Sequence, residues 1–272
     1  MQDILIRVRT CGLHTPALQF GVRLAAQLGA AVTAVYACPE PRYVAPAFHP
    51  EVMAALLQNT DELLREGVAA RQAFLEWAAR LKVAAADWLV ARGPVAASLA
   101  EAAARHDLLI LDHAESDRDT AGDLPGLVLR VRRPCIVVPL QGGQFEKFQR
   151  VAIAWNGSPE AMRAVHAALP LLGDAKVLLL RGEERPGRGP VDWHPPFEIG
   201  QYLRGLGLDV TQHAIEAKPD AAGAALLEEA MRFGAQLLVM GAYGRHRFSE
   251  WALGGATGDV LALARIPVLM RH

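Results

Sequence analysis

Residues 237–257 read LLVMGAYGRHRFSEWALGGAT, and the organisation of the chain follows from this stretch. An apolar run of strand length stops at Gly241, Gly244 follows after two residues, and the pair Gly254-Gly255 follows after nine more. A strand, a glycine-bearing loop and the start of a helix form an arrangement that suits an anion. Glycines let backbone N–H groups turn inward, and the helix start adds free N–H donors.

The same spacing also fits a tight strand-to-helix turn that holds no ligand, because glycine is a common turn residue. The stretch lacks the G-x-G-x-x-G of dinucleotide-binding folds, and no Gly-Lys-Ser/Thr of a P-loop follows it. The spacing by itself therefore leaves an anion site and a plain turn as alternatives.

Outward from this stretch, strands and helices alternate, which predicts an α/β fold with a parallel sheet covered on both faces. In the second half we expect strands at 151–155, 176–180, 208–215, 237–240 and 266–270, with helices at 158–172, before 206, at 221–233 and around 260–264. In the first half we expect strands at 4–8, 31–38, 87–92, 108–111 and 135–140, and helices at 16–28, 51–81 and 95–105. The long helix is expected to break near Asn59 or Gly67.

The two halves of the chain repeat one another. Residues 4–6 match 151–153, 107–111 match 236–240, and 133–137 match 266–270 to within a residue. This spacing indicates a duplication at the scale of a domain rather than a short solenoid repeat. We expect domains at 1–140 and 151–272, joined by a polar, glycine-bearing linker at 141–150.

Composition excludes several classes of function. Hydrophobic residues make up 52% of the 272 residues, which is enough for sizeable cores. The 28 basic and 29 acidic residues give a net charge of -1, so we expect neither a nucleic-acid partner nor binding to an anionic membrane. No apolar run is long enough for a membrane span, and the N-terminus lacks the layout of a signal peptide.

The three cysteines are far apart in the sequence, and they form no C-x-x-C pair. They are Cys11, Cys38 and Cys135. An odd number without ligand spacing predicts reduced thiols in a cytoplasmic protein, each acting as a small buried hydrophobic residue.

Together these motifs resemble the universal stress protein family, whose nucleotide loop runs Gly, two residues, Gly, nine residues, Gly, then Ser or Thr. Residues 151–158 (VAIAWNGS), 238–244 (LVMGAYG), 253–257 (LGGAT) and 266–270 (IPVLM) carry the resemblance. It is strong for the second half and rests on strand order and the repeat for the first. It implies a tandem protein of two doubly wound, open, parallel five-stranded sheets, of the adenine nucleotide alpha hydrolase-like type and related by a pseudo-two-fold axis.

The resemblance also implies a site for ATP or a related adenine nucleotide in the second half. The candidate residues are Asn156, Gly241, Gly244, Arg245, Gly254, Gly255 and Thr257. Two of them depart from the family pattern: Asn156 replaces an acidic residue, and Gly255 stands where a hydroxyl residue is expected, so that Thr257 is the nearest substitute. Each candidate also has a plain structural reading, as a turn residue, a helix cap or a solvated charge.

The first half lacks counterparts of these candidate nucleotide-binding residues. Arg9 stands where the repeat has Asn156, and the loop after the fourth strand begins with Asp112 and is acidic through Glu115, Asp117 and Asp119. Such a loop would repel phosphate, and it lacks the spacing of an EF-hand metal loop, so a solvated loop is the preferred reading. We therefore expect the first half to bind no nucleotide.

No catalytic constellation is evident, because there is no G-x-S-x-G elbow, no H-E-x-x-H and no cysteine with an assignable base. Three functions stay open: a nucleotide-binding stress protein, an interaction scaffold with an empty site, and a nucleotide hydrolase. We expect an intrachain pseudo-dimer and leave open whether the chain also forms a homodimer.

Overall fold

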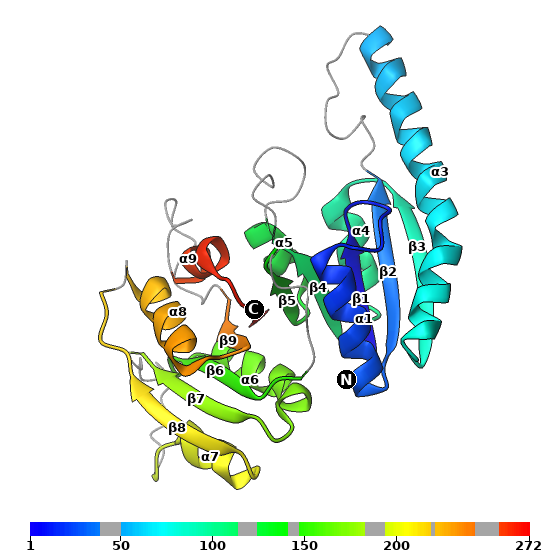
Figure 1. Ribbon diagram of the computed structural model, residues 1–272. Coiled ribbons are helices and arrows are strands. Elements are labelled where there is room, and N and C mark those ends of the chain that lie inside the picture. The colour runs from blue at the N-terminus through cyan, green and yellow to red at the C-terminus, as the bar shows by residue number, and fades with distance from the viewer. Residues whose placement is uncertain (39–49, 114–123, 141–146, 183–193, 219–220, 243–255) are drawn as a thin grey trace. The chain divides into compact units, whose positions relative to one another are not determined.

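The computed structural model describes residues 1–272 except 39–49, 114–123, 141–146, 183–193, 219–220 and 243–255 (Figure 1). The chain divides into two compact units, Met1–Glu146 and Lys147–His272. Each unit is an α/β fold built on a parallel sheet, as the sequence predicted. The pseudo-two-fold packing of the two units stays a prediction.

The elements of the first unit alternate from strand to helix along the chain. They are β1 (Asp3–Val8), α1 (Pro16–Leu28), β2 (Ala31–Cys38), α3 (Pro50–Arg80), β3 (Ala85–Arg92), α4 (Val95–Ala103), β4 (Leu108–Asp112), α5 (Leu124–Val131) and β5 (Cys135–Val138). The strands pair in parallel in the order β3-β2-β1-β4-β5. Helices α1 and α3 cover one face of this sheet, and α4 and α5 cover the other.

The second unit repeats this plan. Its elements are β6 (Arg150–Trp155), α6 (Pro159–Leu172), β7 (Lys176–Arg181), α7 (Ile199–Gly205), β8 (Asp209–Ala214), α8 (Ala222–Phe233), β9 (Leu237–Gly241), α9 (Ala256–Leu263) and β10 (Val268–Arg271). The parallel order is β8-β7-β6-β9-β10, the same as in the first unit. Helices α6 and α7 lie on one face and α8 and α9 on the other (Figure 1).

The central strands owe their apolar character to burial on both faces. Every residue of β4 is buried, and so are all but the first of β1. In each unit the strand that lies farthest from the centre on one side, β3 in the first unit and β8 in the second, mostly alternates between exposed and less exposed positions instead. Continuous apolar runs in the centre and alternation at the edge are what a parallel sheet between two helical layers requires.

Each unit starts its first helix with the same device. Thr15 caps α1 by accepting a hydrogen bond from the Leu18 amide at 3.3 Å, and Ser158 caps α6 by accepting one from Ala161 at 3.1 Å. A proline occupies the first turn of both helices, where its missing N–H costs nothing.

Helix α3 is continuous over 31 residues, so the expected break near Asn59 or Gly67 is wrong. Gly67 is required for packing rather than for a turn. A Cβ at this position would lie 2.6 Å from the Tyr36 ring, and the Gly67 carbonyl accepts a 2.7 Å hydrogen bond from the Trp88 indole. The glycine therefore lets α3 lie close against β2 and β3.

Among the helices that the structure describes, none combines the length and the apolar character needed to cross a lipid bilayer.

Candidate functional site

The order of strands in the second unit places one crevice for a ligand. The chain leaves β6 toward α6 on one face of the sheet, and it leaves the neighbouring strand β9 toward α9 on the other face. In open parallel sheets, ligands bind beyond the carboxyl ends of two strands that diverge in this way. Asn156 follows β6 directly, and Gly241 is the last residue of β9, so these two candidates lie at the ends of neighbouring strands.

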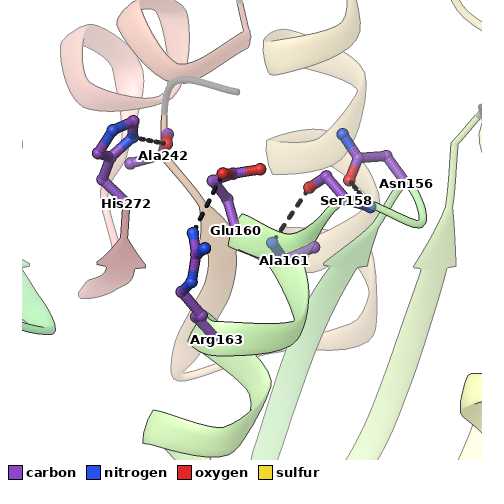
Figure 2. A network of polar contacts seen from close by, with 7 residues as sticks. All are labelled: Asn156, Ser158, Glu160, Ala161, Arg163, Ala242 and His272. Atoms are coloured by element: carbon purple, nitrogen blue, oxygen red, sulfur yellow. Dashed lines mark hydrogen bonds and ion pairs between the residues drawn. The ribbon is translucent and has the colours of Figure 1, made fainter. Parts of the chain in front are cut away.

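The Asn156 side chain is exposed and turns back on its own backbone. Its Oδ1 accepts a hydrogen bond from the Ser158 amide at 3.1 Å, and Ser158 in turn caps α6 (Figure 2). Asn156 therefore shapes the turn between β6 and α6. The carbonyl oxygen is engaged in this contact, and the amide NH₂ is the other polar end of the same side chain.

Gly241 is a glycine for a reason that needs no ligand. A Cβ here would lie 2.6 Å from the amide nitrogen of Ala161 and 2.8 Å from the carbonyl carbon of Glu160. Real Cβ atoms do not approach backbone this closely, so any other residue would push β9 away from α6. Gly241 brings the end of β9 against the first turn of α6.

The sequence reasoning missed Glu160, which stands at this contact. Its side chain is only 6% exposed, and its carboxylate forms an ion pair of 3.1 Å with Arg163 one turn along α6 (Figure 2). A carboxylate in the first turn interacts favourably with the positive end of the helix dipole. Proline followed by glutamate at the start of a predicted helix was the available signal, but it does not reveal the contact with Gly241.

The start of the glycine loop is fixed by the last strand. The Ala242 amide donates to the Arg271 carbonyl at 2.9 Å, and the Ala242 carbonyl accepts a 3.1 Å hydrogen bond from Nδ1 of His272 (Figure 2). Because a carbonyl oxygen only accepts, this contact assigns the proton to Nδ1. Ala242 is fully buried, so the chain leaves β9 along a defined path. The next residues, including Gly244, Arg245, Gly254 and Gly255, lie outside the described part of the chain.

Thr257 is the second residue of α9 and is partly exposed. The position of this helix start depends on Gly223 in α8, where a Cβ would lie 2.6 Å from the Asp259 Cβ and 2.9 Å from the Ala256 carbonyl oxygen. The close approach of α8 and α9 thus sets where the hydroxyl of Thr257 and the first amides of α9 stand.

An aromatic group borders the end of β6 and was also missed. Trp155 is buried, and the Phe197 ring lies against it at 6.3 Å between centroids while remaining 58% exposed. Tyr202 of α7 extends the group at 5.9 Å from Phe197. An exposed ring beside a polar strand end offers a flat apolar surface next to hydrogen-bonding groups.

Next to this aromatic group, Glu198 caps α7. Burial opposes its ionisation, but hydrogen bonds from the amides of Gln201 and Gly200 outweigh burial, and Arg181 at 3.5 Å adds to them. The pKa of Glu198 is therefore held below its ordinary value, and the carboxylate is ionised at neutral pH.

The corresponding place in the first unit corrects the reading of Asp112. This residue is the last of β4 and is 3% exposed, so it does not belong to a solvated loop. Its Oδ1 accepts a 2.5 Å hydrogen bond from the Ala17 amide in the first turn of α1. The partner lies far away in the sequence, which is why the acidic run that follows suggested a loop. Glu115, Asp117 and Asp119 lie outside the described residues.

Within the described ranges, no group of three or more His, Cys, Asp or Glu side chains is placed to hold a metal ion.

Comparison with known proteins agrees with this architecture. A universal stress protein from Archaeoglobus fulgidus DSM 4304 matches with a TM-score of 0.62 and 14% identity, covering 99% of this chain and 95% of its own. A functionally unknown protein from Pseudomonas aeruginosa PAO1 matches with a TM-score of 0.59 and 15% identity, covering 100% of this chain and 92% of its own. At these identities the likeness shows the fold alone.

A comparison of the sequence with protein families identifies the family of the second unit. The chain matches no curated protein, but residues 147–272 match the model of the universal stress protein family. The matched residues are the second compact unit. Residues 147–272 are therefore a universal stress protein domain.

Proposed function

We propose that the protein is a stress-response protein whose second unit binds ATP or a related adenine nucleotide beyond the carboxyl ends of β6 and β9. The observation that carries the proposal is the strand order, because β6 and β9 are neighbours whose chains leave toward opposite faces. Asn156 follows β6 directly, Gly241 ends β9, and α9, which carries Thr257, is the next helix. Asn156 and Gly241 were chosen from a sequence pattern alone, so their positions at the ends of these two strands support the proposal.

The glycine loop supplies the phosphate contacts in this proposal. Gly244, Gly254 and Gly255 present backbone amides, Arg245 adds positive charge, and Thr257 adds a hydroxyl. Asn156 orients the nucleoside through its amide NH₂, since its carbonyl oxygen accepts from the Ser158 amide. The exposed face of Phe197 beside the end of β6 suits a purine ring, because aromatic stacking tolerates any base.

A second function is favoured by two contacts at the same crevice. The backbone and Cβ of Glu160 lie against Gly241, and its buried carboxylate repels phosphate, although Arg163 compensates its charge. The hydrogen bond of Asn156 to Ser158 already accounts for that side chain as a turn residue. Both features fit an interaction scaffold of the same fold whose crevice stays empty.

The proposal is limited to the second unit. In the first unit the end of β4 carries the carboxylate of Asp112, which accepts from the Ala17 amide at the start of α1. An anion of the protein itself therefore occupies the helix start, and Arg9 follows β1 where the second unit has Asn156. We expect no nucleotide there.

The first experiment identifies the ligand. The full chain is purified without added nucleotide and denatured, and the released small molecules are identified by mass spectrometry. An adenine nucleotide at near-stoichiometric yield is expected. A protein that releases none is then titrated with ATP by calorimetry, and absence of heat at millimolar concentration favours the scaffold.

The second experiment locates the site. Gly244→Val should abolish binding, because a β-branched side chain blocks the close backbone approach that the phosphates need. Gly205→Val is the matched control, since a Cβ at Gly205 meets nothing within 4 Å. Nucleotide at about 100 times its dissociation constant should stabilise the wild type and the control by about 2.7 kcal/mol, and Gly244→Val by nothing. Equal stabilisation of all three proteins would place the site elsewhere.

A further inference from the structure

The ends of two neighbouring strands in the first unit bring two distant cysteines together. Strands β1 and β2 are parallel, with Val8 opposite Tyr36. Cys38 is the last residue of β2, and Cys11 lies three residues beyond the end of β1. Since parallel strands end at the same edge of a sheet and lie about 4.8 Å apart, both thiols belong to this edge.

One hydroxyl group connects the two thiols. Tyr36 forms a side-chain hydrogen bond with Cys11 and another with Cys38. Both thiols therefore interact with the same hydroxyl group, in agreement with their places at the neighbouring ends of β1 and β2. Gly67 of α3 packs directly on the Tyr36 ring and holds the hydroxyl in place.

The two thiols differ in their access to solvent. Cys38 is completely buried, whereas Cys11 is partly exposed in the segment after β1. Neither is in a disulfide in this structure. A small oxidant therefore reaches the sulfur of Cys11 before that of Cys38.

We propose that Cys11 and Cys38 form a peroxide-reactive dithiol, in which Cys11 is oxidised first and Cys38 closes an intrachain disulfide with it. Reversible disulfides in an otherwise reducing compartment are mostly of this transient, redox-sensing kind. The ligand class at this site is a hydroperoxide, and hydrogen peroxide is the smallest member.

The reaction balances in two steps. The Cys11 thiolate attacks one peroxide oxygen, so that an S–O bond forms, the O–O bond breaks and hydroxide leaves and takes up a proton to become water. The Cys38 thiol then gives up its proton and attacks the sulfenic sulfur of Cys11, so that the S–S bond forms and the S–O bond breaks with loss of a second water. Two thiols are oxidised to one disulfide, and one peroxide is reduced to two waters.

The surroundings set the pH dependence of the first step. Burial raises the pKa of the Cys11 thiol, Glu66 on α3 raises it further, and the Tyr36 hydroxyl lowers it. Burial and Cys11 raise the pKa of Cys38, while Tyr36 and Arg92 on β3 lower it. Because the thiolate is the nucleophile and is a minor species at neutral pH, the rate should rise about tenfold per pH unit from pH 7 to 8.

Mass spectrometry of the full chain tests the proposal. After treatment with hydrogen peroxide, the intact protein should lose two hydrogen atoms, and a peptide map should link Cys11 to Cys38. Cys11→Ser and Cys38→Ser should each prevent the link. Cys135→Ser is the matched control, because Cys135 is buried at the start of β5 and donates to the Arg133 carbonyl, and it should react like wild type.

Tyr36→Phe tests whether the Tyr36 hydroxyl assists the reaction or whether the two thiols react only because they lie close together. This variant keeps the ring that packs on Gly67 but removes the donor to the Cys11 thiolate, so the disulfide should form several-fold more slowly at pH 7. Three results would overturn the proposal: oxygen addition to Cys11 without a link to Cys38, a link that joins two chains on a non-reducing gel, or three unmodified thiols after peroxide.

Discussion

The two units differ in which element carries an acidic residue where the fourth strand ends against the first helix. In the first unit this residue is Asp112 at the end of β4, and the facing residue of α1 is the small Ala17. In the second unit the end of β9 is Gly241, and the carboxylate belongs to Glu160 on α6. Ala17 and Glu160 hold the same position, directly after the proline that starts each helix.

This exchange shows what a duplicated fold conserves physically. In each unit a small residue stands opposite the acidic one: Ala17 opposite Asp112, and Gly241 opposite Glu160. The electrostatic outcome differs nevertheless. Asp112 accepts directly from an amide of the helix start, whereas Glu160 pairs with Arg163. Only the second arrangement ends the fourth strand on a residue without a side chain.

The largest expected effect comes from adding a side chain at Gly241. Gly241→Val should destabilise the chain by about 3 kcal/mol, because its Cβ meets the Ala161 and Glu160 backbone, which cannot move without displacing α6. Denaturant unfolding of the full chain measures the loss. Gly12→Val, where a Cβ meets nothing within 4 Å, should cost much less. Similar losses in the two variants would show that β9 and α6 are not in close contact.

A smaller effect should distinguish the two carboxylates. Asp112→Ala should cost about 2 kcal/mol, because it leaves the Ala17 amide without this acceptor in a buried place. Glu160→Ala should cost about 1 kcal/mol or less, because its partner Arg163 is 46% exposed. Asp112→Asn keeps an acceptor oxygen and should recover part of the loss. A larger loss of stability for Glu160→Ala than for Asp112→Ala would contradict this comparison.

The smallest effect concerns the opposite, amino-terminal edge of the sheets. Asp107 accepts a 2.7 Å hydrogen bond from the Gln2 amide at the start of β1, and Gln236 accepts one of 2.5 Å from the Gln149 amide before β6. The Gln2 hydrogen bond is the main cause that lowers the pKa of Asp107, against a weaker opposing effect of burial. The carboxylate of Asp107 and the side-chain amide of Gln236 thus accept equivalent hydrogen bonds in the two units. Only the carboxylate changes its charge with pH.

Asp107→Asn should therefore change stability by less than about 0.5 kcal/mol at pH 7. The contribution of Asp107 is complete above the ordinary carboxyl pKa of about 4 and is lost as the pH falls through its lower folded value. Unfolding measured from pH 6 to pH 2 should show a shallower acid loss for Asp107→Asn than for wild type. Gln236→Glu should make the acid loss steeper, and unchanged curves would contradict the assignment.

Most of the fold could be predicted because it depends on local patterns. The buried strands were visible as apolar runs, and Thr15 and Ser158 with their following prolines marked the helix starts. Helix α5 has no counterpart among the expected elements, since its Pro125-Gly126 pair argues locally against a helix although a first turn tolerates proline. The break expected in α3 failed because Gly67 is explained by Tyr36, which no local pattern reveals.

The sequence pattern pointed to two strand ends, but it did not reveal the contacts made there. Glycine spacing and the end of a strand pointed to Gly241 and Asn156, and the strand order makes them neighbours. The contacts of Glu160 with Gly241, of Asp112 with Ala17 and of Cys11 with Tyr36 join segments remote in sequence. Such pairs become visible only once the strand order and the helix faces are known.

The shared strand order also bears on how each unit folds. The central strand pairs with the strand that comes fourth in the sequence, Ile4 with Leu108 in the first unit and Val151 with Leu237 in the second. The long helix α3 makes the first of these loops the longer, but closure entropy grows only with the logarithm of loop length, so the difference amounts to about 0.2 kcal/mol. The two units should therefore form their central pairs with almost equal ease. During synthesis, the first unit folds first because it leaves the ribosome first.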